Sequence, residues 1–217
     1  MTIQWFGQSC FRIETKEGSV LIDPFSKEIG LRPPRIKDDL IAVTHEHFDH
    51  NNLADVSPEA LAKGEAFVVR TPGEYERKGI QVQGIQSFHD NTQGSQRGYN
   101  TIYVIKAEEM VLCHLGDLGQ DALTDQQVGT IGDVDILLVP VGGGPTIDAK
   151  TAVNVVNQIE PKIVIPMHYK VTGLTIDLDG PEKFVKEIGL APEKTEKYKI
   201  TKKLLPVEEI KLVMCTL

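Results

Sequence analysis

Three histidines and one aspartate stand within six residues of one another, in the segment His45-Glu46-His47-Phe48-Asp49-His50. Neutral imidazole nitrogens and carboxylate oxygens are the ligands that zinc and similar divalent ions accept in proteins. The sequence holds only 6 histidines in 217 residues. In chains of this composition, the pattern His-x-His-x-Asp-His would arise by chance roughly three times in ten thousand. The segment therefore predicts a metal site.

The segment follows an apolar run, Leu40–Thr44, that reads as a strand. Side chains alternate along a strand with a period of two, so His45 and His47 are expected to point the same way. Asp49 and His50 can reach a second position a few ångströms away. The spacing therefore makes two metal ions plausible.

Ligand-type residues also stand at the ends of other predicted strands. They are Asp23, His89, His114, Asp117 and His168. A single histidine at a strand end is more often a satisfied polar group than a ligand. Their shared placement at strand ends favours one common site instead.

The elements that must position these residues are mostly strands. Short apolar and β-branched runs recur through the chain. They are 3–13, 19–22, 40–44, 66–71, 80–88, 101–105, 110–114, 136–141, 163–167 and 210–215. Helical patterns lie between them: a weak one after Asp49, then 121–131, 148–159 with Asp148 as a candidate N-cap, and 180–188. The predicted class is α/β, with two packed sheets and helices outside.

Composition narrows the function classes. Hydrophobic residues make up 41% and charged residues 25%, as in ordinary globular proteins. The 23 basic against 31 acidic residues give a net charge of −8, which makes a nucleic-acid partner unlikely. No apolar run approaches the roughly 18 to 20 residues of a membrane span, and no signal peptide is evident, so we expect a cytoplasmic protein without a membrane partner. The three cysteines lack a Cys-x-x-Cys motif and indicate buried thiols.

Five segments carry a resemblance that covers nearly the whole chain. They are Leu21–Pro24, Thr44–His50, Ser87–His89, His114–Asp117 and Ile165–Tyr169. In these segments and their order the sequence resembles the metallo-β-lactamase superfamily. Within it, the sequence is similar to small single-domain metal-dependent hydrolases related to a bacterial lactonase that opens ascorbate 6-phosphate. The resemblance implies an αβ/βα four-layer sandwich of two mixed β-sheets flanked by helices, with the metal site along one edge. With no linker or repeat in the sequence, we expect one domain over 1–217.

The resemblance also implies a ligand set for two divalent metal ions. One ion would be held by His45, His47 and His89, the other by Asp49, His50 and His168, and Asp117 would bridge them. Asp23 would lie behind the ligands and accept the free N–H of a ligand imidazole. His114 is the alternative to His89 as third ligand of the first ion. We favour His89, because His114 lies on the strand that already supplies Asp117.

Four further positions or segments attract attention, and the first two have two readings each. Tyr169 could donate a hydrogen bond to a developing oxyanion, or could be a packed aromatic residue. The glycines of Gly142–Thr146 could cradle an anion, but a turn with close backbone approach is the safer interpretation. Thr71–Tyr75 reads as a turn, and the mixed-charge stretch Lys194–Lys203 as a solvated face.

These observations predict a hydrolase that uses a metal-bound hydroxide on an ester, lactone or phosphoester bond of a small, anionic metabolite. The expected catalytic residues are Asp49, Asp117 and Tyr169. Zinc is the expected metal, with manganese or iron as alternatives. A di-iron redox enzyme and a non-enzymatic metal-binding protein are the rival hypotheses. The small size is compatible with a homo-oligomer.

Overall fold

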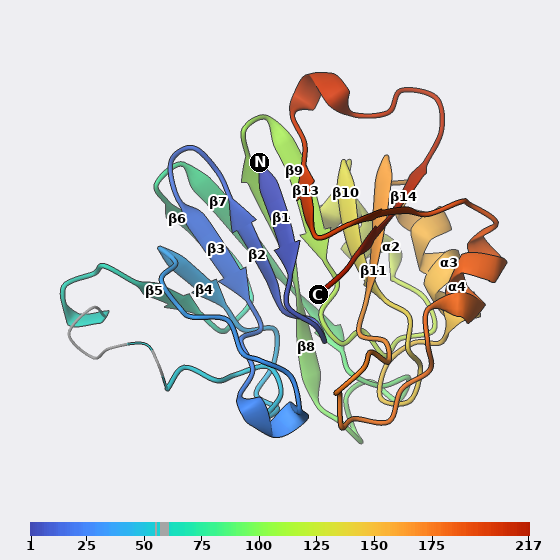
Figure 1. The fold of residues 1–217 in the computed structure, drawn as a ribbon, viewed down its shortest axis with the longest axis horizontal. Coiled ribbons are helices and arrows are strands. Elements are labelled where there is room, and N and C mark those ends of the chain that lie inside the picture. The colour runs from blue at the N-terminus through green and yellow to red at the C-terminus, as the bar shows by residue number, and fades with distance from the viewer. Residues whose placement is uncertain (55, 57–60) are drawn as a thin grey trace.

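The computed structural model describes residues 1–54, 56 and 61–217. Within these residues the chain forms a six-stranded and an eight-stranded sheet that pack face to face (Figure 1). The six-stranded sheet has the order β13 (Lys197–Lys199), β1 (Thr2–Trp5), β2 (Phe11–Glu14), β3 (Ser19–Ile22), β4 (Leu40–Ala42), β5 (Phe67–Val69). The eight-stranded sheet has the order β12 (Glu193–Thr195), β14 (Lys211–Cys215), β11 (Ile163–Met167), β10 (Ile136–Pro140), β9 (Met110–His114), β8 (Tyr99–Ala107), β7 (Ile80–Phe88), β6 (Gly73–Arg77).

Both sheets are mixed, as predicted. In the first, β3, β4 and β5 run parallel while β13, β1, β2 and β3 are antiparallel neighbours. In the second, β6 to β9 are antiparallel neighbours, and β9, β10, β11, β14 and β12 run parallel. Parallel neighbours bring their carboxyl ends to the same edge of a sheet, which is what the proposed ligand positions require.

One continuous hydrophobic core joins the two sheets. It contains fully buried side chains from both, such as Phe11 and Val20 of the first sheet and Val104 and Ile165 of the second. All five residues of β10 are buried, whereas the burial of β7 alternates along most of the strand. These patterns show that β10 is covered on both faces and that β7 has one face toward solvent.

The helices with described bounds lie outside the eight-stranded sheet. They are α2 (Asp125–Ile131), α3 (Ala149–Ile159) and α4 (Glu182–Ile188), with two short 3-10 turns, η1 (Lys27–Ile29) and η2 (Lys202–Leu204). Helix α3 packs against β10 and α4 (Figure 1). The Asp148 carboxylate accepts a hydrogen bond from the Thr151 N–H, so the predicted N-cap is confirmed. The weak helical pattern after Asp49 runs into residues 55 and 57–60, which lie outside the described residues.

Three elements differ from the sequence-based expectation. The run 3–13 is a hairpin of two strands, because Gly7 and Gln8 take positive φ angles (100° and 52°) and turn the chain. Of the predicted turn Thr71–Tyr75, residues 73–75 belong to β6, an edge strand paired with β7. The mixed-charge stretch near Lys194 forms β12 and β13, which lie at the edges of the two sheets and remain largely exposed. No helix among the described residues is long and apolar enough to cross a membrane.

Candidate metal centre

Seven nominated side chains meet at one edge of the two sheets. Four come from the loop after β4, and the others follow β7, β9 and β11. Their ligand atoms form three overlapping groups, each within 4.8 Å: His45, His47 and His89; His45, His50 and Asp117; Asp49, His50 and His168. The structure therefore gathers every residue that the resemblance nominated as a ligand.

Asp117 lies at the middle of this cluster. Its Oδ2 atom is 3.1 Å from His168 Nε2, 3.2 Å from His50 Nε2, 3.5 Å from His89 Nε2 and 3.9 Å from His45 Nε2. The carboxylate is 2% exposed. One oxygen that faces four imidazole nitrogens has the position expected of a bridging ligand between two ions.

The electrostatics of the cluster keep Asp117 ionised. Burial alone would raise its pKa, but the charges of His168 and His50 beside its Oδ2 atom hold the pKa well below its ordinary range. Burial and the neighbouring imidazoles lower the pKa of His45 to about 2, so this ring is neutral and free to bind a cation. The pKa of His50 is raised despite its burial, because Asp117 and Asp23 face it.

The cluster has unsatisfied hydrogen-bonding capacity. Among the described residues, the Nε2 atoms of His45 and His50 are buried without a hydrogen-bond partner. A buried polar atom left unpaired costs about 1–3 kcal/mol, so such atoms are rare unless a ligand satisfies them. A divalent cation between these nitrogens and Asp117 would satisfy them. The residues present therefore fit a metal site.

Asp23 orients the ring of His50 from behind. Its Oδ2 accepts from His50 Nδ1 at 3.0 Å, and its two oxygens accept from the N–H and hydroxyl of Thr44 at 2.8 Å each. The bond to Nδ1 leaves Nε2 of His50 facing the cluster. This is the position that the resemblance implied for Asp23.

His89 and His114 differ in what their ring nitrogens do. His114 Nε2 donates to the Ser9 carbonyl at 2.8 Å, and its Nδ1 accepts from the Gly116 N–H at 3.0 Å. Both nitrogens of His114 are therefore used by the backbone. His89 lies within the cluster, beside His45 and His47. The geometry places His89 rather than His114 where a third ligand of the first ion would stand.

Tyr169 occupies a different place from the one expected for a catalytic group. Its ring lies 4.9 Å from the ring of Trp5, and its hydroxyl donates to the Cys215 carbonyl at 3.4 Å. The side chain is buried and its pKa is raised by that burial. The arrangement corresponds to a packed aromatic residue, and we assign Tyr169 no part in the chemistry.

Gln8 is a member of the cluster that sequence reasoning missed. Its fully buried amide nitrogen lies 2.8 Å from Asp49 Oδ2 and 2.9 Å from His168 Nε2. The Gln8 carbonyl also accepts from the His168 N–H. A carboxamide is not a typical metal ligand, and Gln8 is distant in sequence from every nominated residue, so no local pattern pointed to it.

The backbone around the cluster is held in uncommon conformations. Gln8, Asp23 and His168 have φ angles of 52°, 49° and 51°, a region that residues other than glycine rarely adopt. Gly142 lies so close to this backbone that a Cβ atom there would stand 2.2 Å from the His168 carbonyl oxygen. The glycine run after β10 therefore serves close backbone approach, the interpretation favoured from the sequence.

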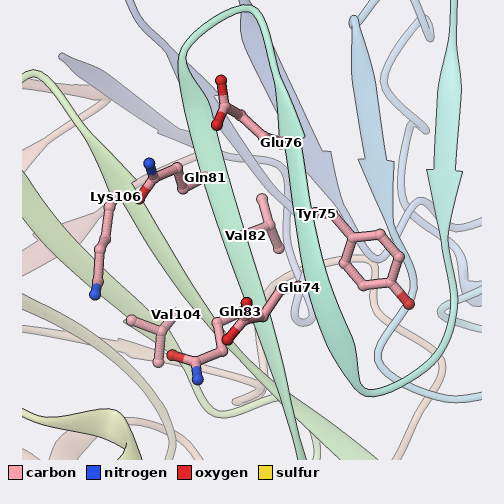
Figure 2. Close-up of a pocket in the computed structure, with 8 residues that line it drawn as sticks. All are labelled: Glu74, Tyr75, Glu76, Gln81, Val82, Gln83, Val104 and Lys106. Carbon is pink, nitrogen blue, oxygen red and sulfur yellow. The ribbon is translucent and has the colours of Figure 1, made fainter.

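Two cavities adjoin the cluster on either side of Arg97. One, of about 400 Å³, is lined by His45 and His47, and the other, of about 350 Å³, by His89. Another cavity of about 350 Å³ lies elsewhere, over β6, β7 and β8 (Figure 2). Its polar side chains, such as Glu74, Glu76 and Lys106, belong to no group of ligand atoms found among the described residues.

Comparisons with known proteins agree with this geometry. Residues 2–168 match a family model described as a beta-lactamase superfamily domain. A UPF0173 protein of Pyrococcus furiosus is 34% identical and covers 96% of this chain and 98% of its own length. The chain belongs to the UPF0173 family of the metallo-β-lactamase superfamily. A UPF0173 metal-dependent hydrolase of Methanopyrus kandleri is 29% identical, over 89% of this chain and 95% of its own.

A solved structure from Thermotoga maritima shows the same fold as this UPF0173 protein. It is described as a Zn-dependent hydrolase of the metallo-β-lactamase superfamily, and it aligns with a TM-score of 0.76 and 31% identity over 98% of this chain and 97% of that chain. The metallo-β-lactamase fold and the assignment as a metal-dependent hydrolase are thereby confirmed. The narrower resemblance to the ascorbate-6-phosphate lactonase branch is not shown, and UPF0173 is the family that the comparisons support.

Proposed function

We propose that this UPF0173 protein is a two-metal hydrolase that cleaves an ester, lactone or phosphoester bond in a small anionic molecule. One observation carries the proposal: Asp117 Oδ2 lies among four imidazole nitrogens, with a triad of candidate ligands on either side. A structural zinc site usually needs four ligands, whereas seven converge in this cluster.

The ligand roles follow from the groups of side chains. His45, His47 and His89 would hold one ion, and Asp49, His50 and His168 the other, with Asp117 between them. Bound divalent ions supply an activated water at neutral pH and polarise the substrate oxygen. Asp23 holds the His50 ring in the tautomer that presents Nε2. Zinc is the expected metal, because imidazole and carboxylate ligands suit it.

The substrate is a small molecule in this proposal. The two cavities beside the cluster, about 400 and 350 Å³, have the size of small-molecule sites. The net charge of −8 disfavours a polynucleotide partner. The same ligand set can serve lactones, esters and phosphoesters, so the resemblance to a sugar-lactone-opening enzyme makes lactones one class to assay.

Metal content per chain tests the proposal. The protein would be purified without added metal or chelator and analysed for elements, with the His168→Ala variant as control. About two zinc or manganese ions per chain, falling in the variant, would support a two-metal hydrolase. Two irons would support redox chemistry instead. One ion or none, even after reconstitution, would contradict a bridging role for Asp117.

A further inference from the structure

The loop between β7 and β8 is folded around a single carboxylate. Asp90 Oδ1 accepts from the Thr92 N–H, the Thr92 hydroxyl and the Gly94 N–H, each at 2.8 Å. Its Oδ2 accepts from the N–H groups of Gln96 and Arg97 at 3.0 and 2.7 Å. The loop begins directly after His89, so its shape is fixed next to the metal centre.

This loop holds Arg97 in the wall shared by the two cavities that adjoin the cluster. Among the described residues, its guanidinium group has no ion-pair or hydrogen-bond partner. Arg70, which lines one of the same cavities, differs because it pairs with Glu46 at 3.2 Å. Arg97 therefore places beside the cluster a positive charge that has no ion-pair partner among the described residues, in a protein whose net charge is −8.

Arg97 lies close to the candidate ligands. It lines the cavity of about 400 Å³ together with His45 and His47, and the cavity of about 350 Å³ together with His89. Tyr99, two residues further along, lines the cavity of about 400 Å³ and is 65% exposed. Arg97 and the exposed ring of Tyr99 therefore line the same cavity beside the cluster.

We propose that Arg97 binds an anionic group of the substrate, a carboxylate or a phosphate, while the scissile bond lies at the metal centre. The guanidinium plane offers paired N–H donors that match either anion. The exposed ring of Tyr99 in the same cavity suits an apolar body that carries this anion. For the reaction itself this inference rests on the proposed function, whereas binding of the anion does not.

The test begins with equilibrium binding to zinc-loaded protein, measured by calorimetry. Benzoate and phenylphosphonate are titrated separately, so that carboxylate and phosphate recognition are distinguished. We expect Arg97→Gln to weaken binding of at least one probe about tenfold, and Arg97→Lys to recover part of that loss. Arg32→Gln removes an equal charge at an exposed position that lines neither of the two cavities and should change binding less than about twofold.

Two results would overturn the inference. One is equal binding by wild type and Arg97→Gln, which includes the case in which wild type binds neither probe. The other is an equal loss in Arg32→Gln, because a general charge effect would then explain it.

A turnover assay separates this inference from the proposed function. Mono-4-nitrophenyl adipate carries a distal carboxylate, and 4-nitrophenyl hexanoate is its neutral counterpart with the same leaving group. Arg97→Gln should lower kcat/KM about tenfold for the adipate ester and leave the hexanoate ester unchanged. An unchanged ratio of the two values would count against Arg97 while the hydrolase stands. If wild type hydrolyses neither ester, ester hydrolysis loses support and the binding experiment still decides the role of Arg97.

Discussion

Two buried aspartates lie at opposite ends of the same parallel strands, and their surroundings differ. Asp135 precedes β10 and accepts from Lys162 at 2.6 Å, from Lys202 at 3.0 Å and from the Val111 N–H at 3.0 Å. Asp117 follows β9 and faces imidazole nitrogens, with no lysine or arginine within ion-pair distance among the described residues.

The difference shows what each end of the sheet is used for. The charge of Asp135 is compensated by the chain itself, so this end contributes stability. At the other end the chain supplies imidazole nitrogens and carboxylate oxygens instead of lysine or arginine side chains. The carboxylates of Asp117 and Asp23 raise the pKa of His50, so this end favours a bound cation. A proton on His50 can serve as that cation in the metal-free protein, and a divalent ion can replace the proton.

Replacing each aspartate in turn should separate the two roles, with the largest effect at Asp117. Asp117→Ala should lower metal content and reduce hydrolysis by about 1,000-fold or more, because both ions lose a shared ligand. Asp135→Ala should keep the metal and cost about 1–3 kcal/mol of unfolding free energy. Elemental analysis measures the metal content, a hydrolysis assay measures the turnover, and thermal unfolding measures the stability of each variant. Loss of metal in Asp135→Ala, or an unchanged metal content in Asp117→Ala, would contradict this division of roles between the two aspartates.

The two histidines at strand ends sharpen the same distinction. His89→Ala should lower the metal content of the protein, since His89 lies within a group of three ligand nitrogens. His114→Ala should leave the metal content intact and reduce only stability, because both its ring nitrogens bond the backbone. The measurement is metal stoichiometry with melting temperature. The reverse pattern would exchange the two assignments.

Sequence reasoning could find the ligand set because metal chemistry restricts the residue types. His45, His47, Asp49 and His50 stand together in the chain, and strand-end placement led to the others. Two packed sheets followed from the apolar runs, and their mixed strand directions from the family resemblance. What the sequence could not show was contact between distant polar groups: Gln8 reaches Asp49 only through the hairpin turn, and Tyr169 turns away toward Cys215.

The strand boundaries that the sequence did not predict have local causes. The break between β1 and β2 depends on positive φ angles at Gly7 and Gln8. The pattern of apolar residues does not indicate that a glutamine will adopt this left-handed backbone conformation. No residue of the edge strands β6 and β12 is buried, so these strands lack the alternation that identifies a strand. Strand β13 does alternate, but its three residues are too few to identify it.

The imidazole-rich end should make the metal-free protein sensitive to acid. The folded pKa of His45 is about 2, below the ordinary value near 6.5, so only the unfolded chain gains its proton as pH falls. Between pH 6.5 and 5 this should cost about 2 kcal/mol of unfolding free energy from His45 alone. The raised pKa of His50 has the opposite effect: it lowers the free energy of unfolding as pH rises above 6.5, because the unfolded chain then loses a proton that the folded protein keeps. Thermal unfolding of chelator-treated protein at pH 5, 6 and 7 measures the effect.

A matched variant attributes that acid sensitivity to the cluster. Metal-free His45→Gln lacks the titrating ring and should show a shallower loss of stability from pH 7 to pH 5 than wild type. Equal stability of the wild type at the two pH values would show that the buried imidazoles are protonated in the folded state, contrary to the lowered pKa of His45.

The smallest expected effect is at Gln8, where an amide supports the ligands without a charge. Its side-chain nitrogen contacts both Asp49 and His168, which belong to one group of candidate ligands. Gln8→Ala removes those contacts but keeps the backbone carbonyl that accepts from Trp5 and His168. Loss of such supporting groups typically costs 10- to 100-fold in metal affinity.

We therefore expect Gln8→Ala to weaken binding of the more weakly held ion about tenfold, measured by chelator competition, while the other ion is retained. Gln8→Asn tests whether an amide at shorter reach restores part of the affinity. Equal loss of both ions would mean that Gln8 supports the fold of the whole edge. Unchanged affinity would mean that its contacts with Asp49 and His168 are replaced when the metal binds, and the position would then belong with Asp135 among groups that serve stability alone.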